Sequence, residues 1–119
     1  MNIINLTPHA LTVYSENGAL LGIFESNGII RLATKKVKIG EADGIPLFST
    51  EFGDPEGLPE KLDRQAIYIV SALAKKATAL AFAENYDEEE GEGLPRVASP
   101  GELVRNEKGE VIGCKGFDI

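Results

Sequence analysis

The clearest pattern in the chain is a change of hydrophobic periodicity between residues 66–71 and 72–83. The first segment, Ala-Ile-Tyr-Ile-Val-Ser, is β-branched and aromatic, and it runs directly into a second segment that is rich in alanine. This pattern predicts a buried strand that feeds a helix over about residues 71–84, with Ser71 as the helix N-cap. The residues expected to form the buried stripe of the helix are Leu73, Ala77, Leu80 and Ala81. Those expected to face outward are Lys75, Lys76 and Thr78.

Shorter apolar and alternating segments indicate strands on both sides of this unit. Residues 16–18 and 106–109 carry hairpin turn signals, and the Gly- and Pro-rich residues 53–59 are typical of a loop. The expected strands are residues 2–5, 11–14, 20–25, 29–39, a segment within 44–52, 103–105 and 111–114. This order predicts an α+β fold. We expect a mixed, mostly antiparallel sheet, one main helix packed on one face, a C-terminal hairpin and a single domain over residues 1–119.

Composition narrows the classes of partner. The chain has 119 residues and a formal net charge of −7, which argues against nucleic acid and membranes as partners because both favour a cationic face. Cys114 is the only cysteine, so it forms no internal disulfide and fits a reducing compartment. The sequence starts without a charged-then-apolar leader, and no uncharged apolar run approaches about 20 residues. We therefore expect a cytoplasmic protein.

Residues 85–95 hold five acidic side chains and two glycines, which predicts a solvated, mobile loop. The acidic positions are Asp87, Glu88, Glu89, Glu90 and Glu92. Their spacing does not match an EF-hand calcium loop. His9 is the only histidine, so a zinc site is not expected either. No metal or cofactor is predicted.

The sequence predicts a binding site where the ends of neighbouring strands meet. If residues 2–5 run beside and parallel to residues 67–70, the segment after residue 5 emerges near the start of the helix. Free backbone N–H groups and the positive dipole end favour an anion there. A sharp Ser-Pro-Gly turn at residues 99–101 is expected to add backbone donors. The predicted ligand-binding residues are Asn5, Thr7, His9, Ser71, Ser99, Gly101 and Arg105, with Arg31 as another source of positive charge.

A structural interpretation of the same residues competes with this one. Thr7 would cap a turn, His9 would fill the edge of the core, and Ser71 would only cap the helix. Catalysis by a pair of Cys114 and His9 is conceivable. However, an apolar strand around Cys114 favours ordinary packing of the thiol. No catalytic residue is therefore predicted.

Several short motifs carry a resemblance to a known family. They are Ile-Asn-Leu-Thr-Pro-His at residues 4–9, Ser-Pro-Gly-Glu-Leu-Val-Arg at residues 99–105, and Gly-Cys-Lys at residues 113–115. With them, the chain resembles a family of small uncharacterised proteins of bacteriophages, prophages and the bacteria that carry them. The resemblance covers nearly the whole chain. It implies a virus-associated protein that works in the host cytoplasm, and it implies no particular activity.

Three functions remain open at the level of sequence. The first is a binding module that sequesters a nucleotide-like anionic small molecule or a host protein and so blunts a host defence. The second is a small hydrolase with His9 as general base. The third is a structural or assembly protein of a virus particle, and the sequence is also compatible with a homo-oligomer. The shortage of nucleophile, base and orienting groups favours the first.

Overall fold

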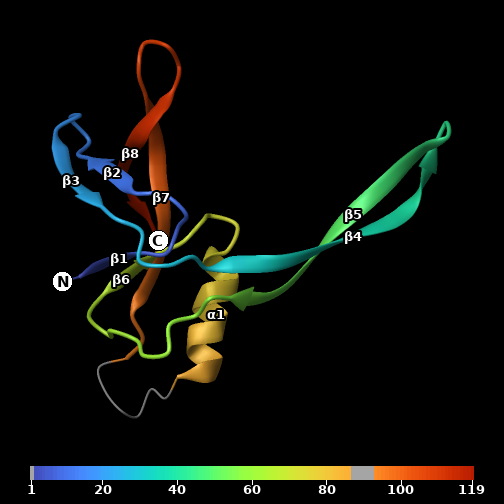
Figure 1. Cartoon of the computed structure of the whole chain (residues 1–119), viewed down its shortest axis with the longest axis horizontal. Coiled ribbons are helices and arrows are strands. Elements are labelled where there is room, and N and C mark those ends of the chain that lie inside the picture. The colour runs from blue at the N-terminus through green and yellow to red at the C-terminus, as the bar shows by residue number, and fades with distance from the viewer. Residues whose placement is uncertain (1, 87–92) are drawn as a thin grey trace.

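The computed structural model of the chain describes residues 2–86 and 93–119, and Figure 1 shows their arrangement. Most described residues lie in strands, and the predicted α+β fold with a C-terminal hairpin is confirmed. In chain order, the elements are β1 (Ile3–Asn5), β2 (Leu11–Tyr14), β3 (Leu20–Phe24), β4 (Arg31–Ala42), β5 (Ile45–Glu56), β6 (Ile67–Ile69), α1 (Lys75–Asn85), β7 (Arg96–Arg105) and β8 (Val111–Asp118).

Six strands form one mixed sheet in the order β1-β6-β7-β8-β2-β3. The parallel pairing of the first strand with residues 67–69 is confirmed, since Ile3 lies opposite Ile67 and Asn5 opposite Ile69. Helix α1 forms the crossover between the parallel strands β6 and β7. The two predicted hairpins, β2–β3 and β7–β8, are antiparallel. Among the described strands, β4 and β5 pair only with each other, as a separate two-stranded sheet.

The six-stranded sheet curves so that its last strand returns towards its first. Asn5, at the end of β1, forms an isolated parallel bridge with Ser26, just after β3. The Asn5 side chain also donates a hydrogen bond to the Phe24 carbonyl at 2.9 Å. These contacts tie the two ends of the sheet together.

The main core lies between the sheet and α1. Tyr68 and Val70 pack there with Ala74 and Phe82 of the helical segment, and all four are buried. The rings of Tyr68 and Phe82 meet edge to face with their centroids 5.4 Å apart, a favourable aromatic geometry. The predicted strand of residues 67–70 is therefore the centre of the core.

The predicted helix start is wrong, and the predicted buried stripe is right at Ala81 and in part at Ala77, but wrong at Leu73 and Leu80. The helix begins at Lys75, and the Ser71 hydroxyl accepts the Ala74 N–H at 3.2 Å within a turn that precedes it. Thr78, Ala81 and Phe82 are the buried helical residues, whereas Leu73 and Leu80 are more than half exposed. The extra turn places Ala74 against the core and shifts the buried face by one residue, which is about 100° around a helix. Alanine at most positions made several faces equally suitable, so periodicity alone could not choose among them.

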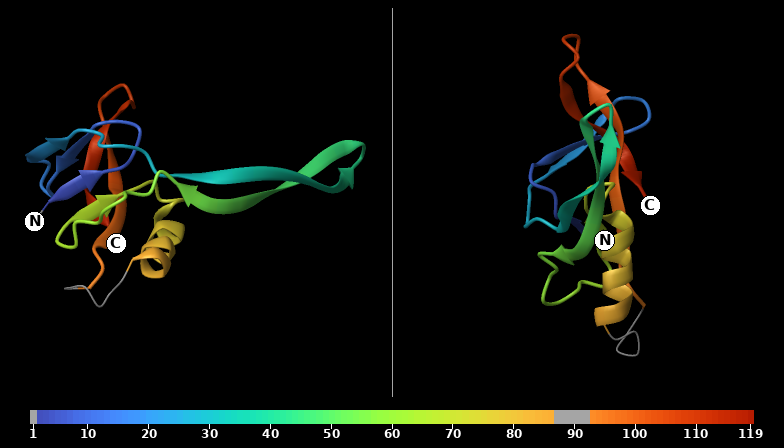
Figure 2. Two further views of the ribbon diagram at one scale, coloured as in Figure 1. Left: turned by 60° about the horizontal axis from the view of Figure 1, so that its bottom comes forward. Right: turned by 90° about the vertical axis from the view of Figure 1, so that its right-hand side faces the viewer.

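Strands β4 and β5 form a long twisted arm that projects from the rest of the molecule (Figures 1 and 2). The arm ends in a turn at Asp43 and Gly44, whose φ angles of 51° and 77° are both positive. This pair is typical of the tight turn that matches strand twist. Strand β5 continues to Glu56, so the loop predicted from residue 53 begins later than expected. We call residues 31–56 the arm and the other described residues the body.

The predicted acidic loop covers residues 85–95. Asn85 is instead the last residue of α1, and the acidic positions within 87–92 lie outside the described residues. Within residues 2–86 and 93–119, no helix has the length and apolar character needed to cross a membrane.

Candidate functional site

The loop after β1 is held by a hydrogen-bonded cluster around Asn5, whose side chain is fully buried. Its Nδ2 donates to the carbonyl oxygens of His9 at 2.8 Å and Phe24 at 2.9 Å. Its Oδ1 accepts the backbone N–H of Thr7 at 2.9 Å and the Thr7 hydroxyl at 2.6 Å. Asparagine side chains commonly fix turns by bonding to the backbone two residues onward. Asn5 and Thr7 therefore use their polar groups to shape the loop that presents His9.

His9 lines a cavity of about 390 Å³ between this loop and the C-terminal hairpin. One wall is formed by residues 9–12 and the other by Pro100, Leu103 and residues 111–114. Ligand pockets of proteins are typically 300–1,000 Å³, largely apolar and equipped with a few polar groups. This cavity has that character, and among its described lining residues His9 alone has a side chain that can become cationic.

Cys114 forms part of the same wall, but its environment opposes nucleophilic chemistry. The thiol is buried, and this burial raises its pKa above the ordinary value of 9.0, while a backbone hydrogen bond from Gly101 acts in the opposite direction. The thiol therefore stays protonated at neutral pH, whereas the thiolate is the nucleophilic form. In the described part of the chain, no hydrogen bond joins His9 to Cys114, so their shared cavity is not a formed catalytic pair.

The predicted turn at residues 99–101 is wrong, because Ser99, Pro100 and Gly101 lie inside strand β7. Ser99 is buried opposite Asp118, and Pro100 lies opposite Phe117 on β8. A Cβ atom on Gly101 would lie 2.2 Å from the Lys115 carbonyl oxygen. Gly101 thus allows β7 and β8 to approach closely, and the segment is part of the wall behind the cavity rather than an open loop of backbone donors.

Arg105 lies at the outer end of the same hairpin. Its guanidinium donates to the Gly109 carbonyl oxygen at 2.8 Å, and its backbone lies opposite Val111, which lines the cavity. Ser99 lies six residues earlier on β7, roughly 20 Å away at the rise of an extended strand. Ser71 is exposed and does not line the cavity. The predicted residues are therefore divided: His9 lines the cavity, whereas Arg105, which pairs with the lining residue Val111, and Ser71 lie outside its lining.

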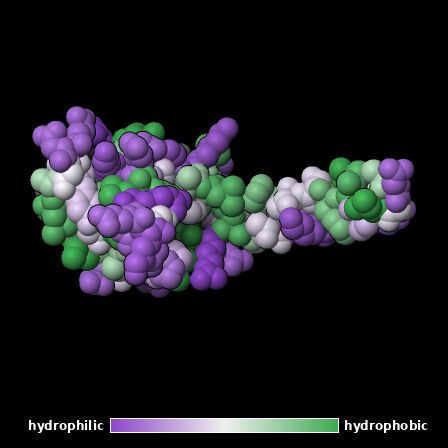
Figure 3. Space-filling view, turned by 90° about the horizontal axis from the view of Figure 1, so that it is seen from above, coloured by the Kyte–Doolittle hydropathy of each residue, from purple (hydrophilic) through white to green (hydrophobic). Residues whose placement is uncertain are grey.

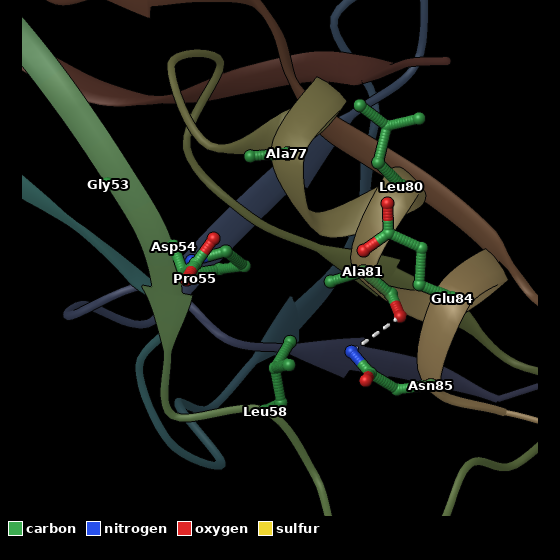
Figure 4. Close-up of a pocket in the computed structure, with 9 residues that line it drawn as sticks. All are labelled: Gly53, Asp54, Pro55, Leu58, Ala77, Leu80, Ala81, Glu84 and Asn85. Atoms are coloured by element: carbon green, nitrogen blue, oxygen red, sulfur yellow. Dashed lines mark hydrogen bonds between the residues drawn. The ribbon is translucent and has the colours of Figure 1, made fainter.

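A second cavity, of about 400 Å³, lies between the root of the arm and α1 (Figure 4). Its lining contains the carboxylates of Asp54 and Glu84 and no cationic side chain. In this wall the Asn85 side chain donates to the Ala81 carbonyl oxygen at 2.9 Å. Two carboxylates repel an anion, so this cavity is unsuited to the predicted ligand class. Within the described ranges, no three His, Cys, Asp or Glu side chains gather to hold a metal ion.

Comparison of the chain with family models, with curated proteins and with solved structures gives no match. The features that sequence reasoning missed are the apolar walls of the His9 cavity and the projecting arm. Leu103 and residues 111–114 were recognised as hairpin strands, and a hydrophobic residue in a strand carries no signal of whether it faces a core or a cavity. In the arm, the alternation at Val37 and Ile39 was visible, but alternation does not tell whether another layer covers the strand.

Proposed function

We propose that this protein is a binding module that holds a small anionic molecule with an apolar, nucleobase-sized part, without altering it. The observation that carries the proposal is the apolar cavity of about 390 Å³ with His9 in its lining. Its volume and apolar walls suit a ring system. The imidazole of His9 can donate a hydrogen bond to an anionic group.

Arg105 strengthens this assignment of ligand class. Its guanidinium contacts a backbone carbonyl on an exposed turn and has no carboxylate partner among the described residues. Arginine recognises phosphate and carboxylate groups through two parallel N–H bonds. A ligand with its ring between Leu11 and Leu103 and its anionic group towards the hairpin end would come within reach of this side chain.

Binding is favoured over hydrolysis for a chemical reason. A hydrolase with His9 as base needs a nucleophile and a group that orients the imidazole. The nearby Cys114 is buried with a raised pKa, and no hydrogen bond to the His9 side chain occurs in the described ranges. With the resemblance to phage and prophage proteins, the proposed role is sequestration of a host signal in the host cytoplasm, which would blunt a host defence.

Titration calorimetry with a panel of nucleotides tests the proposal. We expect His9→Ala and Arg105→Ala each to weaken binding by about 1–3 kcal/mol, the scale of a charge-assisted hydrogen bond. Leu103→Asp should abolish binding because it places a negative charge in the wall. The matched control is Leu73→Asp, since Leu73 is also more than half exposed but lies outside the cavity. Unchanged affinity in all three cavity variants would exclude this site, and conversion of the nucleotide to a product would indicate the hydrolase.

A virion assembly role is the second candidate, and the projecting arm is the observation that favours it. Large rings of the purified protein together with no binding of any nucleotide would support this role over the first.

A further inference from the structure

The arm exposes apolar side chains that no other part of residues 2–86 and 93–119 covers. Its five exposed large apolar residues have between 43% and 67% of their surface accessible, and they are Ile39, Ile45, Leu47, Phe48 and Phe52. Figure 3 shows hydrophobic surface along the arm, both near its root and near its tip. An isolated two-stranded ribbon is at best marginally stable in water. A ribbon of two 12-residue strands with this surface therefore requires a covering partner.

The arm is held firmly where it leaves the body. Ile30, just before β4, is buried in the main core, and Leu32 packs against the same cluster. On the other strand, Gly57 has a φ angle of 89°, and a Cβ atom there would lie 2.1 Å from the Ile29 carbonyl oxygen. The root thus fixes the start of the arm, which lowers the entropy lost when the arm binds a partner.

The excess surface of the chain is large enough to supply one side of a protein interface. The accessible surface is 8145 Å², against about 6,300 Å² for a compact monomer of this mass. The radius of gyration is 17.3 Å, against about 13.5 Å for a compact domain of 119 residues. The excess of roughly 1,800 Å² exceeds the ~800 Å² that each partner contributes to a standard stable complex.

A second uncovered apolar edge lies on the body. Strand β3 is the last strand of the six-stranded sheet, and its sequence Leu-Leu-Gly-Ile-Phe contains no charge. The carbonyl of its last residue, Phe24, accepts a bond from the Asn5 side chain, so the open part of this edge is residues 20–23. Leu20, Leu21 and Ile23 are each more than half exposed on it. Natural edge strands are usually protected by charge, proline or a covering element, and an unprotected apolar edge is a site for pairing.

We propose that the arm of one copy docks along the β3 edge of a second copy, in a closed homo-oligomer. One contact of this kind covers both apolar surfaces at once, whereas a foreign partner on the arm would leave β3 uncovered. Because the docking surfaces differ, the contact is heterologous, and it closes either as a reciprocal pair or as a ring.

A nucleic acid is the alternative partner for the arm. Lys38 lies opposite Phe48, and Lys36 lies two residues before Lys38 on the same strand. Such a mixture of cationic and aromatic side chains is found in proteins that bind single-stranded nucleic acid. However, the arm carries five acidic residues against four basic ones, with Glu51 opposite Lys35 and a salt bridge between Lys38 and Glu41. A protein surface is therefore the favoured occupant.

Light scattering after size-exclusion chromatography tests whether the arm holds the oligomer. We expect the wild-type protein to be a multimer. The double variant Ile45→Asp/Phe48→Asp should be a monomer, and the helix signal in its circular dichroism spectrum should be unchanged. Leu73→Asp, at an exposed leucine outside both surfaces, should leave the multimer intact. A monomeric wild type, or a double variant that stays multimeric, would overturn the proposal. Oligonucleotide binding by a monomeric wild type that is lost in the double variant would overturn it in favour of nucleic acid.

Disulfide trapping tests the pairing of surfaces. Two differently tagged chains, each with Cys114→Ala, carry either Leu21→Cys on β3 or Ile45→Cys near the arm tip. After the two are mixed and oxidised, we expect a disulfide between the two kinds of chain and almost none in either sample alone. Cross-linking of Ile45→Cys chains to one another at the same yield would show that arms meet arms, and this would contradict docking on β3.

Discussion

The body and the arm are made of similar strands but differ in what covers them. In the body, Tyr68, Ile69 and Val70 have at most 2% of their surface exposed, because a helix and the curved sheet enclose them. In the arm, Phe48 and Phe52 are 56% and 51% exposed. Backbone pairing and a tight turn are therefore sufficient to give a strand its shape, whereas covering the strand requires a second layer that only the body possesses.

This difference assigns separate roles to the two regions. The body has a closed core and a cavity in which His9 is held by the buried cluster of Asn5 and Thr7. The arm has an ordered ladder and uncovered apolar side chains. The proposed ligand binding would use the body, and the proposed association between copies would use the arm.

The same substitution made in both regions should give the largest contrast. Phe82→Ala removes a ring that is 1% exposed and packs against Tyr68, and we expect it to lower the free energy of unfolding by about 3–5 kcal/mol. Phe48→Ala, measured at a protein concentration where the chain is monomeric, should cost less than about 1 kcal/mol. Urea denaturation followed by circular dichroism measures both. Equal losses would mean that the arm contributes a core of its own.

The Asn5 cluster predicts the next largest effect. Asn5→Ala removes the acceptor of the buried Thr7 N–H and a donor to the part-buried carbonyls of His9 and Phe24, and we expect a loss of about 2–3 kcal/mol in the free energy of unfolding. Asn27→Ala is the control, because Asn27 is exposed and uses its backbone N–H rather than its side chain to bond with Asn5. A control variant as unstable as Asn5→Ala would show that the buried cluster contributes no more to the free energy of unfolding than an exposed side chain nearby.

A substitution in the turn at the tip of the arm should affect the arm and leave the body unchanged. Gly44→Ala places a side chain on a residue with a φ angle of 77°, which costs roughly 1 kcal/mol. We expect faster amide hydrogen exchange near the tip of β4 and β5 and unchanged exchange in β6 and β7, because the arm opens as its own unit. Faster exchange throughout the body would contradict the division into two regions.

The smallest effect concerns alkaline pH. Burial raises the pKa of Cys114 above 9.0 in the folded protein, so the unfolded chain binds fewer protons than the folded one at alkaline pH. The free energy of unfolding should therefore fall slightly as pH rises through about 9. Cys114→Ala should remove this contribution in denaturant titrations at pH 8 and 9.5. An unchanged pH dependence in the variant would show that the thiol titrates alike in both states.

The sequence predicted the strands and their pairing better than it predicted contacts. The Asn-Gly and Asn-Glu-Lys-Gly turns identified the β2–β3 and β7–β8 hairpins, because these turns have specific backbone requirements. The parallel placement of residues 3–5 beside residues 67–69 was also correct. The prediction of which helix face is buried was wrong at Leu80, because an alanine-rich helix presents no dominant apolar face. Thr78 is buried instead.

The candidate site was predicted only in part, and the reason is physical. His9 was singled out from sequence and does line a cavity, but the Ser-Pro-Gly segment was expected to turn, whereas β8 holds it as a strand. Gly101 permits this close pairing through the absence of a side chain. Such a contact between segments depends on the neighbouring strand, and local sequence does not encode it.

The most direct test of the proposed function is mass spectrometry of small molecules released from the purified protein on denaturation. The protein should be produced in phage-infected or signal-producing bacterial cells, with Leu103→Asp and the control Leu73→Asp prepared in parallel. We predict that an intact anionic, nucleotide-like molecule is released from the wild type and from Leu73→Asp, and that Leu103→Asp releases almost none. Equal release from both leucine variants, or release of a hydrolysed product, would contradict ligand sequestration in the His9 cavity.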